Sequence, residues 1–110
     1  MICRDTAAAA QDELARILDV RSSADAYASY QDFIAGSQLE SQVSVEEYSV
    51  SNRGLRSGLI GTPDQIADRL RGYERVGVGL MLLQFSPQRE EMARFGRDVI
   101  RPWRAAELLR

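Results

Sequence analysis

Apolar residues recur every three to four positions in the first third of the chain, which predicts two amphipathic helices. The first follows the N-cap candidates Asp5 and Thr6 and extends to about residue 18. The second restarts at residues 22–23 and ends at Gly36, a residue type common just past a helix end. The two apolar faces consist of Ala10, Leu14, Ile17 and Leu18, and of Tyr27, Tyr30, Phe33 and Ile34. Residues 1–3 resemble the end of a strand.

The second half alternates short apolar runs with helical patterns. Residues 58–61 predict a short strand, and residues 78–85 predict a continuous apolar strand of the kind found in parallel sheets covered on both faces. Between them, Thr62, Pro63 and Gln65 form a strong helix start, with an N-cap, an N1 proline and a capping box. The pair Ser86-Pro87 repeats that device before a helix that we expect Pro102 to stop.

The order of elements predicts an α/β fold with a parallel sheet and right-handed crossovers. With 110 residues, the chain has room for a single domain, residues 1–110. The strand at 78–85 demands a parallel neighbour on each side, and the chain supplies one good neighbour at most. Residues 37–57 form a long polar connection or insertion, in which short helical or strand pieces are possible. Such a connection suits either an active-site flap or a flexible segment.

The amino-acid composition excludes several kinds of catalytic and metal site. All 14 basic residues are arginine and the chain has no histidine, which excludes lysine-based phosphate loops, Schiff bases, serine–histidine triads and most zinc or haem sites. Cys3 is the sole cysteine, so we expect no disulfide and no metal site. A net charge of −2 argues against nucleic-acid binding, and no apolar run is long enough to span a membrane. Without a signal-peptide pattern, the cytoplasm is the default location.

Several segments together resemble the bacterial luciferase-like, flavin-dependent monooxygenases. Residues 58–70, with the sequence GLIGTPDQIADRL, resemble the seventh βα unit of that family. Residues 76–85 and 95–100 are similar to its last strand and closing helix, and residues 2–6, ICRDT, to the end of its sixth strand. The branch that acts on alkanesulfonates and dimethylsulfone is the most similar. The resemblance covers most of the chain, loosely over residues 20–55.

This resemblance implies a (β/α)8 TIM barrel, of which the chain is the last quarter, from the end of strand 6 to helix 8. The family uses reduced FMN and O2, with the flavin delivered by a separate reductase. The full enzyme would oxidise a small organosulfur compound, an alkanesulfonate or a sulfone, and cleave a C–S bond. Most of the family's active-site residues come from earlier strands, so we expect this chain alone to be inactive. Whether FMN or a deazaflavin is used stays open, because the residues that contact the ring lie elsewhere in the barrel.

Two groups of residues are candidates for the site. The carboxyl ends of barrel strands surround the active-site mouth, which is where the resemblance puts Arg4, Gly61, Thr62 and Ser86. In the sulfonate branch a mobile loop carries arginine that closes over the flavin and an anionic substrate, and Arg53 and Arg56 lie in the corresponding loop. A guanidinium suits a sulfonate or phosphate, although two solvated loop arginines would give the same pattern.

A second class of function is also compatible with the sequence. The chain would then be a non-catalytic α/β protein that associates with a partner, or with further copies of itself, through its open sheet edge. Unpaired parallel strands favour such association, so we expect a homo-oligomer or binding through that edge in either case.

Overall fold

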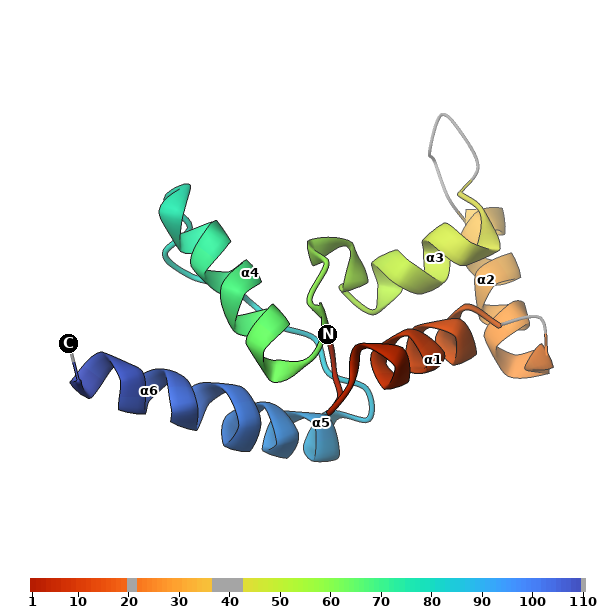
Figure 1. Ribbon diagram of the computed structural model, residues 1–110. Coiled ribbons are helices and arrows are strands. Elements are labelled where there is room, and N and C mark those ends of the chain that lie inside the picture. The colour runs from red at the N-terminus through yellow and green to blue at the C-terminus, as the bar shows by residue number, and fades with distance from the viewer. Residues whose placement is uncertain (20–21, 37–42, 110) are drawn as a thin grey trace.

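The computed structural model describes residues 1–19, 22–36, 43–109 and contains a small parallel sheet between two groups of helices (Figure 1). Strand β1 (Ile2–Cys3) pairs with β2 (Ile60–Gly61) in parallel, with Ile2 opposite Ile60 and Cys3 opposite Gly61. The order along the chain is strand, helices, strand, helices, as expected for an α/β fold. Two paired strands do not form a barrel, so the barrel remains a prediction.

The helices of the first half are α1 (Ala7–Leu18), α2 (Ala24–Gly36) and α3 (Val45–Asn52), followed by the 3-10 turn η2 (Leu55–Ser57). Thr6 caps α1 as predicted, with its hydroxyl accepting a hydrogen bond from the Ala9 amide at 3.1 Å. Helix α3 lies within the polar connection of residues 37–57. It begins there because Ser44 and Glu47 form a capping box. Residues 37–42 of that connection lie outside the described residues.

Helix α4 (Pro63–Arg75) begins as the sequence predicted, with Thr62 and Gln65 in a capping box and Pro63 in the first turn. A long continuous helix closes the chain in three parts: α5 (Gln88–Phe95), the π-helical turn η3 (Gly96–Ile100) and α6 (Arg101–Leu108) (Figure 1). The expectation that Pro102 stops this helix is wrong. Pro102 follows the wider turn of η3, where the regular hydrogen-bond ladder is already interrupted and a missing N–H costs little.

Two further expectations need correction. Ser86 does not cap α5, because Pro87 occupies the N-cap position and no side chain caps that end. Residues 78–85 connect α4 to α5 without regular secondary structure and are not a strand of the sheet. Among the described residues they have no strand beside them with which to form a ladder.

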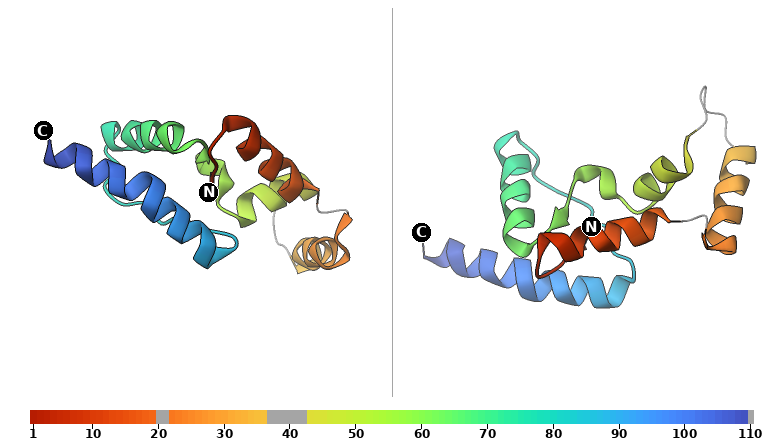
Figure 2. Two further views of the ribbon diagram at one scale, coloured as in Figure 1. Left: turned by 60° about the horizontal axis from the view of Figure 1, so that its bottom comes forward. Right: turned by 45° about the vertical axis from the view of Figure 1, so that its right-hand side comes forward.

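Alternate residues of the strands enter two separate cores. Met1, Cys3 and Leu59 pack with Ile66 of α4 and Val99 of η3, whereas Ile2 packs with Ala10 and Ile17 of α1 and Leu55 of η2. Because successive strand residues point to opposite faces, the helices cover both faces of the two-stranded sheet. Figure 2 shows α1 and α3 on one side of the strands and α4 on the other. In a closed barrel the helices would lie on one face only.

The molecule is elongated rather than compact. Its dimensions are 52 × 29 × 22 Å and its radius of gyration is 16.1 Å, against about 13 Å expected for a compact domain of this length. Much apolar surface is left in contact with solvent, including Leu80 and Leu82 in the segment between α4 and α5. The fold therefore has the character of one part of a larger α/β structure.

Candidate functional site

Three of the predicted site residues come together where β1 ends. The Arg4 amide donates to the Gly61 carbonyl at 3.0 Å, which fixes the end of β1 against the end of β2. The Arg4 side chain turns the other way, into a narrow cavity that it lines with Arg53 and Ser86. This cavity measures about 10 Å³, enough for about one water molecule. Apolar residues such as Ile2 and Leu55 line it together with Glu13 and Glu91, and it is too small for a ligand larger than a water molecule.

A buried carboxylate anchors Arg4. Glu91 of α5 faces both ends of the Arg4 guanidinium, with Nη1 donating to Oε2 and Nη2 lying beside Oε1, each at 3.0 Å. The Glu91 side chain is only 7% exposed and that of Arg4 19%. Arg94 of α5 lies 3.7 Å from the same carboxylate. This bidentate pair ties the end of β1 to the start of the long closing helix.

A second carboxylate lies at the edge of the same cluster. Glu13 of α1 accepts hydrogen bonds from Arg16 at 2.6 and 3.0 Å and lies 3.9 Å from the Arg4 guanidinium. The hydrogen bond from Arg16 lowers the pKa of Glu13, and the nearby charges of Arg4 and Arg53 act in the same direction, against the opposing effect of burial. The end of β1 is thus surrounded by ionised groups of both signs.

Arg53 separates this cluster from a larger cavity. Together with Gln84, Ser86 and Gln88 it lines an open cavity of about 400 Å³, whose apolar wall is formed by Leu83 and Phe85. Within the described residues no carboxylate lies within ion-pair distance of the Arg53 guanidinium. A half-buried arginine beside a hydroxyl and two amides suits an oxyanion, because a guanidinium offers several N–H donors in one plane.

The other candidates lie elsewhere. Arg56 is directed to Ser51, to which its Nε donates at 2.7 Å, and to Glu47, whose carboxylate lies 3.6 Å away. Thr62 is occupied in the capping box of α4. Gly61 lines a separate polar cavity of about 460 Å³ between α1 and α4, to which Arg69 also contributes.

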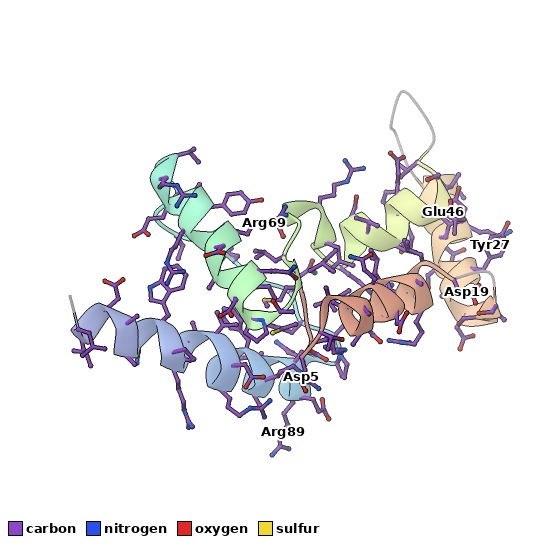
Figure 3. The ribbon with its side chains drawn as sticks, viewed as in Figure 1. Asp5, Asp19, Tyr27, Glu46, Arg69 and Arg89 are labelled. Carbon is purple, nitrogen blue, oxygen red and sulfur yellow. The ribbon has the colours of Figure 1, made fainter. Side chains whose placement is uncertain are left out.

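Arg69 also lies close to a glycine that precedes β2. It extends from α4 toward the turn that follows η2, where a side chain at Gly58 would meet its guanidinium (Figure 3). Gly58 has a φ of +74°, so both its backbone conformation and the lack of space favour glycine. A hydrogen bond joins η2 to α4 nearby, where the Tyr73 hydroxyl donates to the Ser57 carbonyl at 2.6 Å.

Sequence reasoning missed Glu91 and Glu13 as members of the cluster. Glu90 and Glu91 do not form a carboxylate pair, because adjacent helix residues do not face each other, and Glu90 is exposed while Glu91 is buried. The partner that makes Glu91 important is Arg4, 87 positions away in the sequence. The signal available was an acidic residue four positions before Phe95, a spacing that puts Glu91 and Phe95 on the same side of the helix.

Cys3 does not add a reactive group to the site. The thiol is buried and burial raises its pKa, so the thiolate is disfavoured near neutral pH. The described part of the chain contains no group of three or more His, Cys, Asp and Glu residues placed to hold a metal ion. It also contains no helix with the length and apolar character needed to cross a membrane.

Comparison with known proteins places these features in context. No family model matches the chain. It is 32% identical over 108 residues to the FMNH2-dependent dimethylsulfone monooxygenase of Pseudomonas fluorescens (strain Pf0-1), an alignment that covers 91% of this chain and 29% of the relative. It is 45% identical over 49 residues to the enzyme of the same name from Pseudomonas putida, covering 44% of this chain and 14% of the relative.

The chain therefore spans less than a third of the length of these curated relatives. Their names agree with the resemblance carried by residues 2–6, 58–70, 76–85 and 95–100. The chain is a homologue of part of a luciferase-like, flavin-dependent monooxygenase.

Proposed function

We propose that the chain supplies the C-terminal part of a luciferase-like monooxygenase that uses reduced FMN and O2 to oxidise a small organosulfur compound in the cytoplasm. The observation that carries the proposal is the similarity to the dimethylsulfone monooxygenases over nearly the whole chain. A sulfone or an alkanesulfonate is the proposed substrate class, and a separate flavin reductase is the proposed partner. The chain alone supplies no turnover, because the other active-site residues belong to the remainder of the enzyme.

The residues of the larger cavity fit the anionic end of a ligand. Arg53, Ser86, Gln84 and Gln88 present a guanidinium, a hydroxyl and two amides around about 400 Å³, within the usual size range of small-molecule pockets. Reduced FMN, when bound, supplies the electrons and activates O2. The donors of this cavity suit its phosphate, or the sulfonate of a substrate, and Phe85 is an aromatic side chain beside them.

In this proposal the residues have distinct roles. Arg53 binds the oxyanion directly, and Ser86 donates or accepts a hydrogen bond beside it. Arg4 does not bind the ligand in this proposal, because Glu91 already pairs with both of its Nη atoms and the Cys3 carbonyl accepts a further hydrogen bond from Nη1. It instead holds the end of β1 to α5, and so keeps Ser86 and the loop of Arg53 at fixed positions around the narrow cavity that all three line.

A chimera tests this proposal. Residues 1–110 replace the matched part of the P. fluorescens enzyme, and Arg53→Met is compared with Arg56→Met, since Arg56 lies outside the cavity. Losing one charged hydrogen-bonding group weakens binding by about 10- to 100-fold. We expect the affinity of the chimera for its anionic ligand to fall by that factor for Arg53→Met and by less than about twofold for Arg56→Met.

Two ligand comparisons identify the anion. If Arg53 binds the flavin phosphate, Arg53→Met weakens reduced FMN but not reduced riboflavin. If it binds a substrate sulfonate, the variant raises KM for methanesulfonate but not for dimethylsulfone. Equal behaviour of the Arg53 and Arg56 variants with all four ligands contradicts the role given to Arg53.

A further inference from the structure

Gly54, which directly follows Arg53, has a left-handed backbone conformation with a φ of +65°. Glycine adopts such a φ without steric penalty, whereas a residue with a Cβ atom is strained there. Two hydrogen bonds hold this turn from within its own loop. The Gly54 amide donates to the Ser51 carbonyl at 3.1 Å, and the Ser57 hydroxyl donates to the Gly54 carbonyl at 3.1 Å. Local bonds therefore fix one side of the backbone next to Arg53.

The side chain of Gln84, from a distant part of the sequence, covers the other side of this turn. A Cβ atom added at Gly54 would lie 2.8 Å from Oε1, 3.4 Å from Cβ and 3.6 Å from Cδ of Gln84. The Gln84 side chain therefore lies along the turn, in the space where any other residue would carry its own side chain. A separation of 2.8 Å is too short for an unstrained contact with a Cβ atom, so glycine is what lets Gln84 lie there.

The core of the protein anchors Gln84 in turn. Its backbone carbonyl accepts a hydrogen bond from the N-terminal ammonium at 2.6 Å. Its neighbours Leu83 and Phe85 pack against the core formed by β1, α4 and η3. The contact with the glycine turn therefore joins the loop of Arg53 to a segment whose place the core sets, and the cavity of about 400 Å³ is lined by both segments.

We propose that Gln84 is a positioning residue for Arg53. Its side chain closes the Gly54 turn from outside and so keeps the Arg53 guanidinium at the cavity. Within the described residues no carboxylate pairs with this guanidinium, so its position depends on the backbone that carries it. Displacing such a group by about 1 Å can lower the activity of an enzyme about 100-fold. The proposal rests on the role given to Arg53 in the proposed function.

Ligand affinity in the chimera separates positioning from direct binding, the alternative role for a residue that itself lines the cavity. Gln84→Ala should weaken the anionic ligand that Arg53→Met weakens, either reduced FMN or methanesulfonate, by about three- to tenfold. In the Arg53→Met background the same change should alter the affinity by less than about 1.5-fold, because the group that Gln84 positions is gone. Direct contact between the Gln84 amide and the ligand would give the same loss in both backgrounds.

A pair of glycine variants tests the contact without any ligand. Gly54→Ala pushes a Cβ atom against Gln84, so the hydrogen-bonded amides of residues 54 and 58 should exchange at least about tenfold faster. Adding Gln84→Ala makes room for that atom and should slow the exchange at least about threefold again. Gly58→Ala is the matched control, because Gly58 also has a positive φ, +74°, but the side chain beside it is that of Arg69. Adding Gln84→Ala to Gly58→Ala should give no recovery.

Two results would overturn the proposal. One is a change in affinity from Gln84→Ala that is the same with and without Arg53, including no change in either background when Arg53→Met itself weakens binding. The other is amide exchange that Gln84→Ala fails to slow in Gly54→Ala, or slows equally in Gly58→Ala. If Arg53→Met leaves the affinity for every ligand unchanged, the proposed function loses its anion site. Recovery confined to Gly54→Ala would then still assign Gln84 to holding the turn of Arg53.

Discussion

The ion pair between Arg4 and Glu91 offers the sharpest test of how the site is held together. The change is Glu91→Gln, which keeps the size of the side chain and removes its charge. At the observed separation of 3.0 Å, two unit charges attract by about 5 kcal/mol at an effective dielectric constant of about 20. Burying the ions costs several kcal/mol each, so the net value of the intact pair is far smaller than the attraction.

Removing one partner is costly because the other stays buried. Breaking a fully buried pair destabilises a protein by about 3–5 kcal/mol. Arg4 is 19% exposed and keeps Glu13 at 3.9 Å, so we place the loss for Glu91→Gln at about 2 kcal/mol. Glu90→Gln is the matched control on the same turn, and its exposed position predicts a change within about 0.5 kcal/mol.

Urea unfolding followed by circular dichroism gives the change in the free energy of unfolding for Glu91→Gln and for Glu90→Gln. A double-mutant cycle with Arg4→Met then isolates the pair, and its coupling energy should be about 1–2 kcal/mol. If Glu91→Gln unfolds at the same urea concentration as Glu90→Gln, the carboxylate does not anchor Arg4 and the reasoning is refuted.

Three further predictions concern single groups. Glu13 has a lowered pKa because of Arg16, so its contribution to stability is present above its ordinary pKa and is lost as pH falls through the lowered value. The free energy of unfolding, measured by urea titration, should therefore fall less between pH 7 and pH 3 for Glu13→Gln than for wild type, by about 0.5 kcal/mol. An equal fall in both proteins would argue against this contribution. The Ser49 hydroxyl is buried and has no hydrogen-bond partner among the described residues, so Ser49→Ala should raise the free energy of unfolding by about 1 kcal/mol, and a loss of stability would reveal a partner. Thr62→Ala removes the hydroxyl that accepts from the Gln65 amide at 3.3 Å and should cost about 1 kcal/mol; unchanged stability would show that this cap contributes nothing.

Local signals in the sequence predicted local structure well. The caps at Thr6 and Thr62 depend on residues within one helical turn, and both are present. The same reasoning failed at Ser86 and Pro102, where the outcome depends on the path of the chain before the helix and on a π turn within it. The strand expected at residues 78–85 failed for a related reason. A strand needs a partner, and its own sequence cannot supply one.

The role of the candidate residues at a site stays a prediction. Three of them, Arg4, Arg53 and Ser86, line one narrow cavity. The rule that strand ends meet does not account for this, because residues 78–85 are not a strand of the sheet and the strand-end residue Gly61 lines another cavity.

The sequence could not separate Arg53 from Arg56, because their different directions depend on Ser51 and Glu47 of α3. The role of Glu91 could not be predicted from the sequence either, because it depends on packing between the two ends of the chain.

Turnover by the chimera shows whether residues 1–110 can complete a flavin-dependent monooxygenase. Residues 1–110 take the place of the matched part of the P. fluorescens enzyme, and consumption of dimethylsulfone is followed with reduced FMN and O2. We predict that the chimera consumes dimethylsulfone only when both reduced FMN and O2 are present, and that the 110-residue chain alone consumes none. A folded chimera that binds reduced FMN but consumes no dimethylsulfone or alkanesulfonate would contradict this prediction and favour a non-catalytic α/β protein.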